Sequence, residues 1–157
     1  MNNNVNFEKN NVVFNYRVGV LIRNNNKILV EKHKDFTYYL LPGGRCEFNE
    51  TSIDTGIREM KEETGLDIKY IKSIGLIENF FISNYNHKRY HELFMIHEYE
   101  FIDKNNYNIK IINNIEDDKD VIYEWIDLNK LKELEFKPNI ALDIINSKEF
   151  THYINRD

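Results

Sequence analysis

The stretch that decides the fold of this chain runs from Gly44 to Leu66 and reads GRCEFNETSIDTGIREMKEETGL. Thr51 or Ser52 can cap a helix that begins here, and Gly65 is suited to end it. Between these ends, the apolar residues are spaced for one face of a helix and the glutamates for another. The stretch therefore predicts an amphipathic helix with a dense acidic side.

The acidic side of this predicted helix carries Glu59, Glu62 and Glu63. Glu59 has the other two at i+3 and i+4, and a helix turns about 100° per residue, so all three lie on one side. Like charges this close repel and raise one another's pKa, and a bound cation relieves that repulsion. Clustered hard oxygen ligands suit Mg²⁺ or Mn²⁺. The sequence therefore predicts a divalent metal site with these three glutamates as ligands.

The spacing of residues along this stretch resembles the signature of the Nudix hydrolase family. The signature is Gly, five residues, Glu, seven residues, Arg-Glu, an apolar residue, any residue, Glu-Glu, any residue, Gly and an apolar residue. Every fixed position is filled, by Gly44, Glu50, Arg58, Glu59, Met60, Glu62, Glu63, Gly65 and Leu66. One departure is Thr55-Gly56, where many members carry alanines. Residues 44–66 are called the Nudix box below.

The resemblance implies an α/β fold, namely an α/β/α sandwich with a central mixed β-sheet. A chain of 157 residues suits one domain. We therefore expect residues 1–157 to form a single Nudix domain, with its core over about 12–147 and short polar tails at both ends.

Outside the box, the residue pattern predicts mainly strands. Runs of β-branched and aromatic residues predict strands over 12–22, 27–31, 38–41, 68–83, 89–101 and 121–126. Short helices are predicted over 127–134 and from Pro138, at the first helical position, to about Asn146. Residues 103–119 are expected to be irregular.

The resemblance also implies a reaction. Family members cleave a phosphoanhydride in a nucleoside diphosphate linked to another group. This cleavage needs charge neutralisation and an oriented water more than a covalent nucleophile, which agrees with the predicted Mg²⁺ or Mn²⁺ site. By resemblance, the backbone carbonyl of Gly43 is a further metal ligand. Arg58 is expected to hold a box carboxylate by a bidentate hydrogen bond, with Glu50 as a further partner.

The resemblance leaves two positions open for the general base. In some family members it is the glutamate after the box arginine, here Glu59. Others use a glutamate from a distant loop, and the matching loop here contains Glu116, Asp117, Asp118 and Asp120. We place Glu116 ahead because its longer side chain matches the usual glutamate. The alternative for this loop is a solvated acidic turn.

Further residues are candidates for contacts with the substrate. They are Gly44 and Glu50 in the box, and Glu78 and Glu92 on neighbouring predicted strands. His91, beside Glu92, is more simply explained as a hydrogen-bonded strand residue. One or two base-stacking rings are expected among Phe36, Tyr38, Tyr39, Phe80, Phe81, Tyr85 and Tyr90, although most should pack in the sheet.

Composition excludes several other classes. The net charge of -5 offers no basic surface for a nucleic-acid polymer. No apolar run approaches the roughly 18 residues of a membrane span, and the first residues lack a signal-peptide core, so we expect a cytoplasmic protein without membrane contact. Cys46 is the sole cysteine, so an internal disulfide is excluded.

The rival to an enzyme is a Nudix-fold module that binds a nucleotide without turnover. Such modules commonly lose box carboxylates, whereas this chain keeps them all, which favours a pyrophosphohydrolase acting on a small nucleotide or nucleotide-linked molecule. ADP-ribose, an oxidised nucleoside triphosphate, a dinucleoside polyphosphate and a nucleotide sugar all stay open as substrates. A homodimer is also open, since Nudix enzymes that act on dinucleotides often dimerise.

Overall fold

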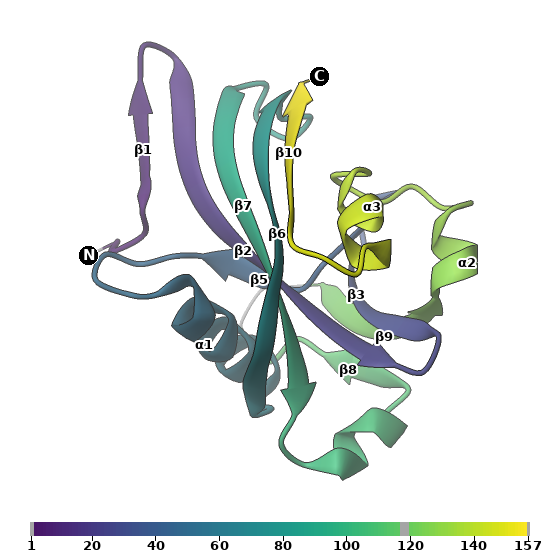
Figure 1. Cartoon of the computed structure of the whole chain (residues 1–157). Helices are drawn as coiled ribbons and strands as arrows, with labels where there is room; N and C mark the ends of the chain where they lie inside the picture. Colours follow the sequence, from purple (N-terminus) through teal and green to yellow (C-terminus); the bar gives the residue numbers. More distant parts are fainter. Residues whose placement is uncertain (1, 117–119, 157) are drawn as a thin grey trace.

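The computed structural model describes residues 2–116 and 120–156, and a mixed β-sheet forms its centre (Figure 1). Its strand order is β10-β6-β7-β2-β3-β9-β8, with β1 and β5 paired to β2, and β4 paired to β3. Two pairs, β2 with β7 and β6 with β10, are parallel, and β6 with β7 is antiparallel. The strands are β1 (Asn6–Lys9), β2 (Val12–Asn24), β3 (Lys27–His33), β4 (Tyr39–Leu40), β5 (Gly43–Arg45), β6 (Ile68–Ile82), β7 (Arg89–Phe101), β8 (Ile111–Asn113), β9 (Val121–Asp127) and β10 (Thr151–Arg156).

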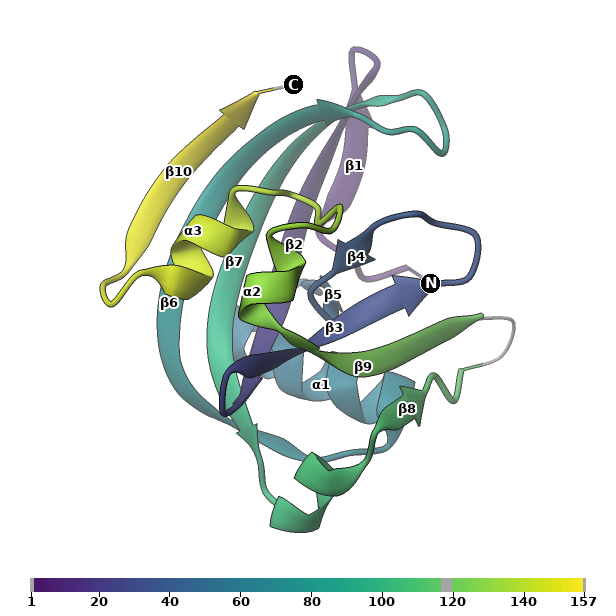
Figure 2. The same cartoon turned by 90° about the vertical axis from the view of Figure 1, so that its right-hand side faces the viewer.

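Helices cover both faces of the central strands (Figures 1 and 2). These are α1 (Ser52–Thr64) on one face and α2 (Leu128–Leu131) and α3 (Ala141–Asn146) on the other, with a short 3-10 helix, η1 (Lys104–Asn108), after β7. Successive side chains of a strand point to opposite faces. In β2, Val20 and Ile22 therefore pack with Met60 of α1, while Leu21 packs with Ile144 of α3. The predicted α/β/α sandwich with a mixed sheet is confirmed.

The ends of α1 agree with the predicted box helix. Thr51 is the N-cap, and its hydroxyl accepts a hydrogen bond from the Asp54 backbone N–H at 3.1 Å. Gly65 lies at the other end with φ 75°, and its N–H donates to the Lys61 carbonyl at 2.9 Å. A left-handed backbone of this kind favours glycine, which accounts for the last glycine of the box.

Gly56 departs from the family pattern because of a ring packed against the helix. A Cβ at Gly56 would lie 2.2 Å from the hydroxyl oxygen of Tyr99. That hydroxyl donates a hydrogen bond to the Ile53 carbonyl at 2.9 Å, and the Tyr99 side chain is buried. Glycine at this position therefore allows a large aromatic residue of β7 to pack directly on the α1 backbone.

The two expected polar tails each contain a strand that lies outside the predicted core of 12–147. β1 pairs with β2 through a turn in which Asn10 and Asn11 have φ of 53° and 62°. Asparagine tolerates this left-handed conformation, which suits a two-residue hairpin turn. β10 pairs in parallel with β6, and the Asn155 side chain donates to the side-chain oxygen Oδ1 of Asn79 at 2.8 Å. Polar residues at inward positions hid this strand from the sequence pattern.

Two smaller differences concern irregular segments. The region expected to be irregular contains η1 and the short strand β8, which pairs with β9. The last helix begins at Ala141, three residues after Pro138, and Asn146 is its last residue. Within the described residues, the longest apolar helices are too short to cross a bilayer. Cys46 is a free and fully buried thiol, and burial raises its pKa.

Candidate functional site

Arg58 is the centre of the hydrogen-bond network on α1. Its Nε and Nη2 donate to the two carboxylate oxygens of Glu50 at 2.7 and 3.0 Å, so the bidentate partner is Glu50, which was expected only as a further partner. Nη1 donates to Glu59 at 3.1 Å and to Glu62 at 3.2 Å, and Nη2 also donates to the Arg45 carbonyl at 2.9 Å. One guanidinium therefore orients three acidic side chains and ties them to β5.

Glu50 serves this network from a largely buried position. Burial raises the pKa of its carboxyl group, but hydrogen bonds from Arg58, from the Glu47 backbone N–H and from the Thr55 hydroxyl together bring that pKa below its usual value. The hydrogen bond to Glu50 raises the pKa of Arg58 above its usual range. Glu50 was a candidate for substrate contact, but both of its oxygens accept hydrogen bonds from protein donors.

Three carboxylates converge beside Arg58. One ligand oxygen from each of Glu59, Glu62 and Glu116 can be chosen so that all three lie within 4.8 Å of one another. The Glu59 side chain is 14 % exposed, and burial, followed by repulsion from Glu63, raises the pKa of its carboxyl group to about 7. A cluster of hard oxygen atoms at this spacing is suited to a divalent cation.

Glu116 reaches the cluster because its loop is fastened to the end of α1. The Ile115 backbone N–H donates to the Glu63 carbonyl at 2.8 Å. The Asn114 side chain accepts from the Glu116 N–H at 2.8 Å and donates to the Tyr123 hydroxyl at 3.1 Å. That hydroxyl donates in turn to the Glu63 carboxylate at 2.6 Å. The loop therefore presents Glu116 to the box side chains.

Among the described residues, the buried Glu63 is not part of the group of three converging carboxylates. Its side chain is buried, and one of its oxygens accepts the hydrogen bond from Tyr123. The set of oxygen atoms that converge thus contains Glu116 where the sequence pointed to Glu63. Glu63 stays a predicted ligand, and its negative charge acts on Glu59.

The two glycines before the box side chains make close backbone approach possible. A Cβ at Gly44 would lie 2.2 Å from the Glu59 carboxylate, so a side chain there would displace the Glu59 side chain. Gly43 has φ 148°, and a Cβ on it would lie 1.9 Å from the Val18 carbonyl oxygen. Both glycines are therefore required by packing, and metal coordination by the Gly43 carbonyl stays a prediction.

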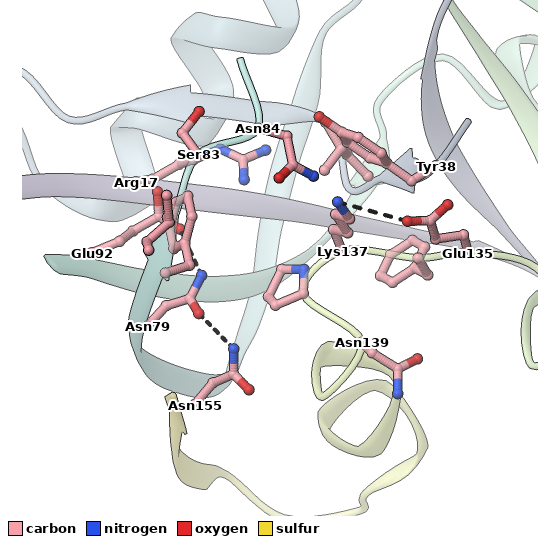
Figure 3. A pocket seen from close by; sticks show the side chains of 15 residues that line it. Arg17, Tyr38, Asn79, Ser83, Asn84, Glu92, Glu135, Lys137, Asn139 and Asn155 are labelled. Atoms are coloured by element: carbon pink, nitrogen blue, oxygen red, sulfur yellow. Dashed lines mark hydrogen bonds and ion pairs between the residues drawn. The ribbon is translucent and has the colours of Figure 1, made fainter. Parts of the chain in front are cut away.

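A cavity of about 640 Å³ lies on the face of the sheet that carries α3 (Figure 3). Glu92, Asn79 and Asn155 follow one another along one of its walls, from β7, β6 and β10. Arg17 of β2 also lines the cavity and pairs across the sheet with Arg45, next to Gly44. The cavity therefore lies close to β5, the strand in which the Nudix box begins.

The remaining predicted site residues have different positions. Glu92 lines the cavity, but Glu78 does not; it hydrogen-bonds to His152 at 2.8 Å on the opposite side of β6. His91 stacks on Phe80 at 4.5 Å. Asp120 is exposed and lies outside the carboxylate cluster, while the candidates Asp117 and Asp118 lie outside the described residues.

Sequence reasoning missed the other polar residues of the cavity and Asn15, which hydrogen-bonds to Glu92. Asn15 and Arg17 alternate with apolar residues at inward positions of β2, and such polar residues in a strand pattern are a signal for an internal site. Asn155 and Lys137 also line the cavity. They lie in segments for which the sequence pattern predicted neither a strand nor a helix.

The chain matches the NUDIX domain model over residues 13–145. It belongs to the Nudix family. The expected family is thereby confirmed on most of the chain. The box residues Gly44, Glu50, Arg58, Glu59, Glu62 and Glu63 lie within this match.

Individual relatives agree with this membership. This Nudix chain is 33 % identical over 132 residues to the m7GpppN-mRNA hydrolase of Saccharomyces cerevisiae, and the match covers 82 % of this chain and 12 % of the yeast protein. It therefore spans about an eighth of the length of that relative.

Solved structures share the fold. A MutT NUDIX hydrolase from Burkholderia pseudomallei has a TM-score of 0.64 and 20 % identity, covering 85 % of this chain and 98 % of its own. An ADP-ribose pyrophosphatase from Streptococcus suis has a TM-score of 0.59 and 18 % identity, covering 90 % of this chain and 98 % of its own.

Proposed function

We propose that this Nudix protein is a divalent-metal-dependent hydrolase that cleaves a phosphoanhydride bond in a nucleoside diphosphate linked to another moiety. The observation that carries the proposal is the convergence of Glu59, Glu62 and Glu116 beside Arg58. Carboxylates held this close repel, and a bound cation relieves the repulsion. The name of the yeast relative, an mRNA hydrolase acting on m7GpppN, also supports hydrolysis next to a nucleoside phosphate.

The chemistry of the cluster fits Mg²⁺ or Mn²⁺. Glu59, Glu62 and Glu116 would hold the ion through hard oxygen atoms, with Glu63 and the Gly43 carbonyl as further proposed ligands. When bound, the ion would neutralise phosphate oxygens and lower the pKa of a water molecule. Arg58 keeps Glu59 and Glu62 oriented toward this position.

Two glutamates are candidates for the general base. The carboxyl group of Glu59 has a pKa of about 7 in the metal-free protein, near the range that suits proton transfer at neutral pH. Glu116 reaches the same position from a separate loop, where its backbone N–H is held by the Asn114 side chain. Glu116 can act through the carboxylate oxygen that does not hold the ion, and we favour it as the base, with Glu59 as a ligand only.

A screen of nucleotides tests the proposal. The purified protein is incubated with ADP-ribose, oxidised nucleoside triphosphates, dinucleoside polyphosphates and nucleotide sugars, with Mg²⁺ and with Mn²⁺. Release of phosphate or of a nucleoside monophosphate is measured. Turnover of at least one class is expected. Binding without turnover of any class would instead identify the protein as a nucleotide-binding module.

Replacing Glu59 by glutamine should lower turnover of the best substrate by at least about 100-fold, because a charged oxygen ligand is lost while size and polarity are kept. Glu133, which is exposed in the turn after α2, provides the control as Glu133→Gln and should leave turnover unchanged. Steady-state rates at saturating Mg²⁺ give the comparison, with circular dichroism as the check on folding. Near-normal turnover by the folded Glu59→Gln variant would show that the catalytic residues are not on α1.

Replacing Glu116 by glutamine should cut turnover by at least about tenfold, whereas Asp120→Asn should be nearly neutral. The reason is that Glu116 lies in the carboxylate cluster and Asp120 lies outside it, although both belong to one acidic loop. The same steady-state measurement applies. Equal, unchanged rates for both variants would show that the loop is a solvated turn and would leave Glu59 or Glu92 as candidates for the base.

A further inference from the structure

The cavity beside β5 contains a buried acidic side chain that the proposed hydrolysis does not use. Glu92 is 4 % exposed and lines the cavity. Its Oε2 accepts a hydrogen bond of 2.7 Å from Asn15. Among the described residues, its Oε1 accepts a single and long hydrogen bond, 3.4 Å from Asn79. A carboxylate oxygen can accept two hydrogen bonds, so Glu92 keeps acceptor capacity toward the cavity.

The polarity of the neighbouring amides is set by their own hydrogen bonds. The Asn155 side chain donates to the side-chain oxygen of Asn79 at 2.8 Å, so the side-chain amide nitrogen of Asn79 must point toward Glu92 (Figure 3). On the other side of Glu92, Arg45 donates to the side-chain oxygen of Asn15 at 2.8 Å, so the side-chain amide nitrogen of Asn15 also points toward Glu92. Donors thus hold Glu92 in place from both sides as an acceptor.

This network connects the cavity to the Nudix box. The Arg45 side chain holds Asn15, and the Arg45 carbonyl accepts the hydrogen bond from Arg58, which in turn orients Glu59. A ligand group in the cavity and a phosphate at the carboxylate cluster would therefore lie on either side of β5. That arrangement suits one molecule with a recognised end and a reacting end.

Flat apolar surface lies next to the acceptor. Phe81 lines the cavity and is stacked at 5.0 Å on Tyr90, which fixes the plane of its ring. Phe136, buried in the core, contributes to the wall as well. Tyr38 is less suited to stacking, because Phe36 lies against its ring at 4.9 Å and the Lys137 ammonium lies 4.2 Å from its centre. Planar rings beside a carboxylate fit a nucleobase.

We propose that this cavity binds the guanine base of a nucleotide, with Glu92 accepting hydrogen bonds from the ring N1–H and the exocyclic amino group. Guanine presents these two donors side by side, and a carboxylate can accept both. Adenine, cytosine and uracil each place an acceptor next to their donor on the corresponding edge, which a carboxylate repels. The inference rests on the proposed function and specifies its substrate as a guanine nucleotide.

Binding of nucleoside monophosphates tests the base choice without any need for turnover. The monophosphates of deoxyguanosine, deoxyinosine and deoxyadenosine are compared by isothermal titration calorimetry. Guanine has both the N1–H and the neighbouring amino group, hypoxanthine has only the N1–H, and adenine has an acceptor at N1. We expect the guanine compound to bind at least about tenfold more tightly than the adenine compound, with hypoxanthine between them. Equal affinities, or no binding by any of the three, would overturn the inference.

A cis-diol of ribose also offers two neighbouring donors, and a second arm separates it from the base. Guanosine and adenosine monophosphates are titrated beside their deoxy forms. If Glu92 reads guanine, the ribose compounds repeat the order of the deoxy compounds. A gain of about tenfold from the 2′-hydroxyl, with no difference between bases, would assign Glu92 to the sugar and refute guanine recognition.

Glu92→Gln gives the residue-specific test, because the amide replaces one acceptor by a donor. It should reduce guanine affinity by about tenfold, to the level of adenine, and leave adenine affinity nearly unchanged. Glu100→Gln, on the same strand but in exposed ion pairs with Lys69 and Lys104, is the matched control and should keep the guanine preference. A guanine preference that survives in folded Glu92→Gln would rule out this contact. Guanine-selective binding without hydrolysis in the screen would refute the proposed enzyme while retaining the pocket.

Discussion

Excess chelator is expected to abolish nucleotide hydrolysis by this Nudix protein, and added Mg²⁺ or Mn²⁺ should restore it. The physical reason is that Glu59, Glu62 and Glu116 converge within 4.8 Å and would hold the ion that neutralises phosphate charge. Initial rates are measured on the best substrate of the screen, before and after addition of the metal. Monovalent salt at equal ionic strength is the control. Undiminished hydrolysis in chelator would contradict the metal mechanism.

The metal requirement should also depend on pH. Burial raises the pKa of Glu59 to about 7 in the metal-free protein, and a carboxyl group must lose its proton before it binds a cation. The Mn²⁺ concentration for half-maximal binding should therefore rise by up to about tenfold per pH unit below 7 and level off above it. Mn²⁺ titrations followed by electron paramagnetic resonance at pH 6, 7 and 8 provide the measurement. The same weak affinity at all three values would argue against Glu59 as a ligand.

Replacing Arg58 by methionine is expected to lower the free energy of unfolding by about 3–5 kcal/mol, because it leaves the buried Glu50 carboxylate without its cation. The Arg58 and Glu50 side chains are 23 % and 15 % exposed, so solvent cannot compensate fully. Urea unfolding at pH 7 measures the loss. Lys69→Met, which breaks an exposed pair with Glu100, is the control and should change stability by at most about 1 kcal/mol.

The effect of Arg58→Met should diminish in acid. The folded-state pKa of Glu50 lies below its usual value of 4.5, so this group stabilises the native protein above that value and loses its contribution as the pH falls through the folded-state pKa. The difference in stability between wild type and variant should therefore be largest at neutral pH and shrink below about 4.5. Adding Glu50→Gln to Arg58→Met should recover part of the stability, because the stranded charge is removed. A difference that is constant with pH would show that packing alone explains the loss.

The sequence by itself determined the box helix and the class of fold. The cap at Thr51, the glutamates from Glu59 onward and the terminal Gly65 act within a few positions of one another, so local geometry suffices to predict a helix and its acidic side. A contact between Arg58 and Glu50 was expected at the same short range, whereas its bidentate geometry came from the structure. Runs of β-branched and aromatic residues predicted the long strands for a similar reason, because the preference for a strand is carried by neighbouring residues.

The tertiary structure alone decided which distant residues meet. Glu116 joins Glu59 because Ile115 and Tyr123 fasten a separate loop to the end of α1, and no periodicity encodes such a contact. Gly56 is explained by Tyr99, which is far from it in the sequence and packs on α1 from strand β7. The cavity wall formed by Glu92, Asn79 and Asn155 likewise depends on strands that are far apart in the chain. β10 places Asn155 beside Asn79 by pairing with β6, and such pairing is decided by packing rather than by local propensity.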